Sequence, residues 1–162
     1  MRPEKDAGYF TVNTPRTKLF TGFVRGRTFP LGNVILKIGP TRLDWATISI
    51  SVIDGQGFDR PGRVLIAATG WMQNQNAKLE HLSDHRITLR HQWGQEPVLC
   101  EGIPAATTLP VPVERAKFFP LDEAGNRREA IPVGSNENRA LVELDPRRQT
   151  VWYEVEILPP GH

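Results

Sequence analysis

The feature of this sequence that most restricts its fold is a strict alternation of side-chain type over residues 45–52. Apolar residues take the even positions from Ala46 to Val52, while serine and threonine share the odd positions with Trp45. Successive side chains of a β-strand point to opposite faces, so the pattern predicts a strand with one face on a core. Residues 151–157 alternate in the same way and predict a closing strand.

Short apolar segments separated by turn residues recur along the rest of the chain, and no window shows a helical period. We predict strands over residues 9–12, 18–24, 34–38, 63–69, 87–91, 97–100, 105–109, 116–121, 128–133 and 139–144. Their number and spacing predict an all-β fold, a two-sheet antiparallel β-sandwich that is immunoglobulin-like or jelly-roll-like. The expected organisation is a flexible lead-in over residues 1–8, one sandwich domain over 9–158 and a tail over 159–162.

The composition indicates that the chain folds, and the sequence argues against nucleic acid and membranes as partners. Hydrophobic residues make up 39% of the 162 residues and charged residues 23%, and the net charge is only +2. So small a charge predicts no nucleic-acid partner, because phosphate binding needs a strong positive field. No apolar stretch is long enough to span a membrane, so no membrane partner is expected. The single cysteine, Cys100, excludes an internal disulfide.

Three stretches resemble the C-terminal β-sandwich accessory domain that follows the TIM barrel of large bacterial glycoside hydrolases. Residues 10–17 read F-T-V-N-T-P-R-T, close to the family's F-T-V-D-T-P-R-T, with Asn13 in place of the aspartate. Residues 63–70 read R-V-L-I-A-A-T-G, similar to R-I-L-L-T-A-x-G, and residues 93–102 read W-G-Q-E-P-V-L-C-E-G, similar to W-G-x-x-P-V-L-V-E-G. Further likeness at residues 117–122 and 150–153 extends the resemblance over nearly the whole chain.

The resemblance implies a non-catalytic domain of a secreted polysaccharide-degrading enzyme. Its catalytic carboxylates would lie on a barrel elsewhere in the parent chain, so this chain is expected not to be an enzyme. The departures from the family are concentrated after Gly70, where the family reads approximately R-A-E-N-T-G and this chain reads W-M-Q-N-Q-N. We therefore expect this loop to have a task of its own.

The loop after Gly70 has the composition of a sugar-binding site. Sugars stack their apolar face on an aromatic ring and give their hydroxyls to planar polar groups. Trp71 supplies the ring, and Gln73, Asn74 and Asn76 supply amides. The alternative is that Trp71 packs over a sheet edge and that the amides satisfy backbone groups of a turn.

Three further tryptophans carry separate expectations. Trp45 and Trp152 fall on polar faces of their strands, where they either share a sugar platform or pack in the structure. Trp93 is expected to anchor a loop to the core. Cys100, in an apolar run, is expected to be a buried small hydrophobe.

Other polar clusters give weaker hypotheses. The residues His81, Asp84, His85 and His91 could form a metal site, but their spacing is not specific to metal binding and favours a solvated connection. The loop 54–59 offers oxygen ligands for calcium but favours a plain turn, so no cofactor is expected and calcium stays open. Glu154 and Glu156 share a strand face, and exposed charge is a commoner reason for this than glycoside hydrolysis.

Two hypotheses for function follow. The first is a carbohydrate-binding module that holds a β-linked polysaccharide or oligosaccharide on Trp71, with help from Trp45. The second is a structural domain that packs on the glycoside hydrolase catalytic domain of the parent chain and binds no sugar. The first predicts an aromatic side chain among hydrogen-bonding groups, in a groove or on a flat face, and the second predicts an exposed apolar patch.

Overall fold

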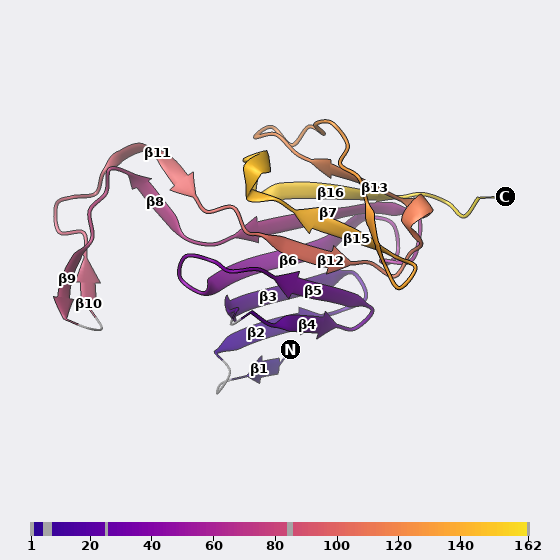
Figure 1. Ribbon diagram of the computed structural model, residues 1–162, viewed down its shortest axis with the longest axis horizontal. Helices are drawn as coiled ribbons and strands as arrows, with labels where there is room; N and C mark the ends of the chain where they lie inside the picture. The colour runs from indigo at the N-terminus through magenta and orange to yellow at the C-terminus, as the bar shows by residue number, and fades with distance from the viewer. Residues whose placement is uncertain (1, 5–7, 25, 84–85, 162) are drawn as a thin grey trace.

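Alternating burial along the strands builds two antiparallel sheets that pack face to face (Figure 1). The computed structural model describes residues 2–4, 8–24, 26–83 and 86–161. The strand over Trp45–Asp54 buries Ala46, Ile48, Ile50 and Val52 and leaves the side chains between them partly exposed, as the alternation predicts. The predicted all-β sandwich is thus confirmed.

The larger sheet has seven strands, and antiparallel pairing joins each to its neighbours. In order across the sheet they are β1 (Arg2–Glu4), β2 (Tyr9–Asn13), β3 (Thr17–Phe23), β6 (Trp45–Asp54), β7 (Gly62–Thr69), β16 (Trp152–Ile157) and β13 (Ala116–Pro120). The predicted closing strand is therefore β16, which lies between β7 and β13.

The smaller sheet has five strands, in the order β14 (Gly134–Asn136), β15 (Arg139–Leu144), β12 (Ala105–Thr108), β5 (Val34–Ile38) and β4 (Thr28–Leu31). Two 3-10 turns, η1 (Val113–Arg115) and η2 (Pro146–Arg148), precede β13 and β16 respectively. Two ribbons stand apart from both sheets: β8 (Met72–Gln75) with β11 (Gln95–Cys100), and β9 (Glu80–Ser83) with β10 (Arg86–Thr88).

The core lies between the two sheets. At one end Phe20 packs at a tilt against Phe29, with ring centroids 4.1 Å apart, and Tyr9 meets Phe29 edge-on at 5.2 Å. At the other end Phe118 stacks on Tyr153 at 5.4 Å. Phe29 belongs to the smaller sheet and the other four rings belong to the larger one, so burying the first cluster holds the two layers together.

The predicted strand over residues 128–133 is wrong. Within the described chain this segment makes an isolated bridge between Ile131 and Phe118, and its backbone otherwise follows a loop. Pro132 lacks the N–H that a continued ladder would need. The loop nevertheless folds back over β13, since the N–H of Arg128 donates to the Pro120 carbonyl at 2.9 Å.

Candidate functional site

The segment after Gly70 is a strand rather than the expected loop. β8 pairs with β11, the chain continues into the β9–β10 ribbon, and together they form an arm, residues 71–101, that projects from one end of the sandwich (Figure 1). Gly94 closes the turn before β11 with φ +72°, and a Cβ there would lie 2.3 Å from the Gln75 carbonyl oxygen. Only glycine fits this turn without strain.

The root of the arm is fixed by Glu101. Its carboxylate accepts the backbone N–H of Arg42 at 2.6 Å and that of Trp71 at 3.1 Å. The guanidinium of Arg42 in turn lies 3.8 Å from the centroid of the Trp71 ring. One face of Trp71 is therefore already covered by a cation, which leaves less of the ring for a sugar.

Two of the three amides predicted to bind hydroxyls, those of Gln73 and Asn74, are used within the arm. The Gln73 side chain donates to the Ala77 carbonyl at 2.7 Å, and the Asn74 side chain donates to the Trp93 carbonyl at 2.9 Å. Asn76 adopts a left-handed backbone with φ 63°, a conformation that asparagine tolerates in turns. These bonds match the alternative considered for the loop, in which amides satisfy turn backbone groups.

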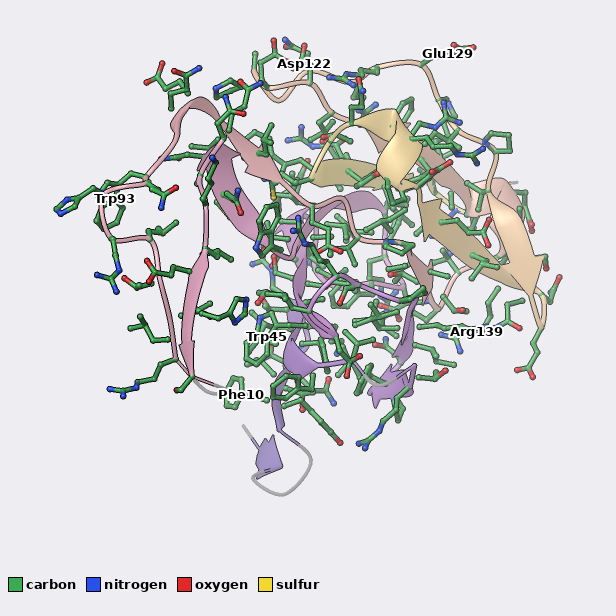
Figure 2. All side chains as sticks on the ribbon, turned by 60° about the vertical axis from the view of Figure 1, so that its left-hand side comes forward. Phe10, Trp45, Trp93, Asp122, Glu129 and Arg139 are labelled. Carbon is green, nitrogen blue, oxygen red and sulfur yellow. The ribbon has the colours of Figure 1, made fainter. Side chains whose placement is uncertain are left out.

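The structure brings Trp71, Gln73 and Asn74 together with Trp93 around a hollow of about 250 Å³ on the arm. The expectation that Trp93 anchors a loop to the core is wrong, because 61% of this side chain is exposed. Figure 2 shows it far out on the arm, away from Trp45. The sequence does not predict this exposure, because an apolar motif alone does not show whether its side chains face a core.

Trp45 lies at the start of β6, on the outer face of the larger sheet. It is 40% exposed and meets Phe23 of β3 edge-to-face, with ring centroids 5.3 Å apart. It lines neither the hollow on the arm nor the cleft beside Trp152. The structure therefore does not assemble Trp45 and Trp152 into one ligand cleft.

Trp152 lines the larger of these two hollows. A cleft of about 540 Å³ separates the arm root from the loops that flank β13 and β16. Trp152 is 41% exposed in this cleft, where it lies among Glu123, Arg128, Gln149 and Thr150. A volume in this range and a mixture of one indole with several polar groups are typical of a small-ligand site.

The polar groups of the cleft differ in how far they are engaged. Asp122 accepts the backbone N–H and the side-chain amide of Asn126, and also the N–H of Ala124, and these bonds lower the pKa of its carboxyl. Asp122 therefore shapes the turn. The Glu123 carboxylate is 95% exposed and 3.9 Å from Arg128, whose guanidinium donates to the Arg148 carbonyl at 3.0 Å.

Both glutamates on β16 are tied to one arginine. Arg127 donates to Glu154, which is almost fully buried, and to Glu156 at 2.9 Å, while its guanidinium carbon lies 4.5 Å from the centroid of the Phe119 ring. Each carboxylate thus has a cationic partner. This is a structural arrangement rather than a pair of carboxylates facing a cleft.

Three other expectations from the sequence concern Cys100, a metal site and membrane-spanning segments. Cys100 lines the Trp152 cleft and is exposed, so the expectation of a buried cysteine is wrong. Among the residues that the structure describes, no three His, Cys, Asp or Glu side chains gather as a metal site; Asp84 and His85 lie outside those residues. None of the described helical turns is long or apolar enough to cross a bilayer.

Comparison with known proteins adds no relative. No family model, no curated protein and no solved structure matches this chain.

Proposed function

We propose that the chain is a non-catalytic carbohydrate-binding module and that its sugar site is the cleft beside Trp152. The observation that supports this site is the exposed Trp152 indole among hydrogen-bonding side chains in a cleft of about 540 Å³. This is the arrangement that the sugar-binding hypothesis predicts, although it was expected first at Trp71.

The chemistry of the cleft suits an amphipathic ligand. The apolar face of a pyranose would lie on Trp152, and its hydroxyls would bond to Glu123, Arg128 and Gln149. A carboxylate accepts hydrogen bonds, a guanidinium donates them and an amide does both, so the three cover the needs of a neutral sugar. Trp71 has a smaller part in this proposal, because Arg42 covers one of its faces and its neighbouring amides hold the arm.

Under this proposal the module is part of a larger protein, as the family resemblance implies. It would belong to a secreted glycoside hydrolase, with a catalytic domain in the parent chain and a β-linked polysaccharide as the ligand. Tethering the enzyme to its substrate raises the local concentration of one around the other. One exposed ring predicts modest affinity.

The test is affinity gel electrophoresis of the chain against soluble β-linked glucans, xylans, mannans and galactans, with soluble starch as the α-linked comparison. We expect one β-linked class to retard the chain. Trp152→Ala should weaken that binding about fivefold, since a stacked ring contributes about 1 kcal/mol and about 1.4 kcal/mol corresponds to tenfold.

Trp93→Ala is the matched control, because it removes an indole that is more exposed than Trp152 and lies on the arm. It should leave the retardation unchanged. Loss of retardation in Trp71→Ala alone would move the site to the hollow on the arm and contradict the Trp152 site. No retardation by any of these glycans would overturn the proposed function for this panel.

A second candidate function, a domain that supports a catalytic barrel and binds no sugar, is favoured by the exposed Phe23–Trp45 pair. This pair lies on the outer face of the larger sheet, where a docked domain would cover it. The two functions are separated by the electrophoresis above, because a purely structural domain is not retarded.

A further inference from the structure

The arm exposes several large apolar side chains and has no core of its own. None of its described residues is buried, and its strands pack mainly on their hairpin partners. Seven of the twelve exposed large apolar side chains in the described chain belong to it: Met72, Leu79, Leu82, Ile87, Trp93, Val98 and Leu99. A two-stranded ribbon in water is marginally stable, so an arm of this composition needs a surface to pack on.

The arm is held away from the sandwich that carries it. Glu101 binds the backbone N–H groups of Arg42 and Trp71, which fixes the direction in which the arm leaves. Figure 1 shows the arm extending from the left-hand end of the two sheets and lying over neither of them. The surface on which the arm packs must therefore belong to another molecule or another domain.

The same chain offers a surface of matching character on the outer face of its larger sheet. Along residues 10–12, 17–23, 45–51 and 65–69 this face carries no charged side chain. Two rows cross it in register, Thr21–Thr47–Thr69 and Leu19–Ser49–Ala67, with Trp45 and Phe23 at one end. Small side chains make the middle of this face flat.

The smaller sheet provides the contrast. Its outer face carries Lys37 and Glu143 on either side of Ala106 in one row, as expected of a face that meets water. The uncharged area is thus limited to the part of the larger sheet formed by β2, β3, β6 and residues 65–69 of β7, because Arg63, Glu154 and Glu156 lie on the same face beyond it. Depletion of charged residues at the centre is the compositional mark of a protein interface.

We propose that a second copy of this chain covers both surfaces: the arm of each copy packs on the outer face of the larger sheet of the other, around a two-fold axis. Three properties favour a second copy. Each chain carries both the arm and the face, as a reciprocal two-fold contact requires. The arm has three Lys or Arg against four Asp or Glu, so it meets an uncharged face with almost no net charge. With 31 residues the arm is also large enough to supply, together with the face of its own chain, the roughly 20–30 contacting residues a side of a stable interface.

The mass of the chain in solution tests the proposal. Sedimentation over a wide range of protein concentration should give twice the monomer mass for the wild type. Trp93→Glu on the arm and Ser49→Arg on the face should each raise the dimer dissociation constant by roughly tenfold or more, since each places a charge in an apolar contact. The controls are Ile53→Glu, an exposed apolar residue at the far end of β6, and Ala106→Arg, on the outer face of the smaller sheet. Both controls should stay dimeric, and urea unfolding shows that every variant is folded.

Mixing the two interface variants tests which surfaces meet. Trp93→Glu keeps an intact face and Ser49→Arg keeps an intact arm, so a mixed pair retains one of the two contacts and should associate more tightly than either variant alone. A Ser49→Arg variant that dimerises as well as the wild type would mean that arms pair with arms, and would overturn the arm-on-face contact. A wild type that stays monomeric at every concentration would overturn the second copy and leave another domain, such as a catalytic barrel, as the occupant. The proposal is independent of sugar binding, which the electrophoresis measures separately.

Discussion

Replacing Arg127 should show how much one arginine stabilises the larger sheet around β16. Glu154 is buried, with 8% of its side chain exposed, whereas Arg127 is 35% exposed and binds both Glu154 and Glu156. Removing one partner of a fully buried pair costs about 3–5 kcal/mol, because the other charge is left without compensation. Because Arg127 is partly exposed, water screens this pair and the cost should be smaller than for a fully buried one. We therefore expect Arg127→Met to lower the free energy of unfolding by about 2–3 kcal/mol.

Urea denaturation followed by tryptophan fluorescence measures this free energy. Arg128→Met is the matched control, because the neighbouring arginine lies 3.9 Å from an exposed glutamate and should cost about 0.5 kcal/mol or less. The double variant Arg127→Met/Glu154→Gln should lose less stability than the two single variants added together, since the buried carboxylate that Arg127→Met leaves unpaired is then absent. A cost for Arg127→Met as small as the control's would refute the argument, because the pair would then behave as a surface ion pair.

Three further predictions concern the core, a buried lysine and the arm root. Burial lowers the pKa of Lys18, which is 3% exposed and donates to Asn13 Oδ1 at 2.6 Å. The unfolded chain then holds this proton more tightly, so the free energy of unfolding should rise as the pH increases from below the folded pKa towards 10.5. Urea titrations at successive pH values should show this rise relative to Lys18→Met, and parallel curves would contradict it. Phe20→Ala should cost about 3–5 kcal/mol by the same assay, because it empties the ring cluster with Phe29, whereas a cost near 1 kcal/mol would mean that the sheets close over the gap. Cys100 is exposed and should react with a chromogenic disulfide in the native protein; reaction only after denaturation would show that it is covered.

The fold could be predicted from the sequence where one face of a strand meets the core. β6 buries alternate side chains, and its apolar and polar residues alternate in the same order. β3 and β7 also bury alternate side chains, but their sequences do not alternate, and β7 is predicted from a short apolar run instead. The strand β4 was missed because Pro30 and a short length weaken the signal, although Phe29 and Leu31 are buried. An alternating pattern thus predicts a strand only where burial of one face selects apolar residues at every second position.

The candidate site was harder to predict for the same reason. β8 buries neither face, so Met72–Gln75 has no alternation and resembles a polar loop. Trp93 and Cys100 were expected inside because they are apolar, but the arm gives them no core to enter. The Trp152 cleft joins side chains from the loop after β13, the segment before β16 and the arm root, and their meeting depends on sheet order rather than on local sequence.

The arm root also affects how the chain tolerates changes in length. The N–H of Glu101 donates to the Trp71 carbonyl at 2.8 Å, so the chain leaves the sandwich and returns to it at adjacent points. This short bridge lies on the passage from β7 in one sheet to β12 in the other. Because the ends are already joined, lengthening or shortening what lies between them changes the closure entropy only slowly, by about 0.6 kcal/mol per doubling of loop length. The sandwich can therefore carry arms of many lengths, and this is the position at which a foreign hairpin could be grafted without disturbing the core.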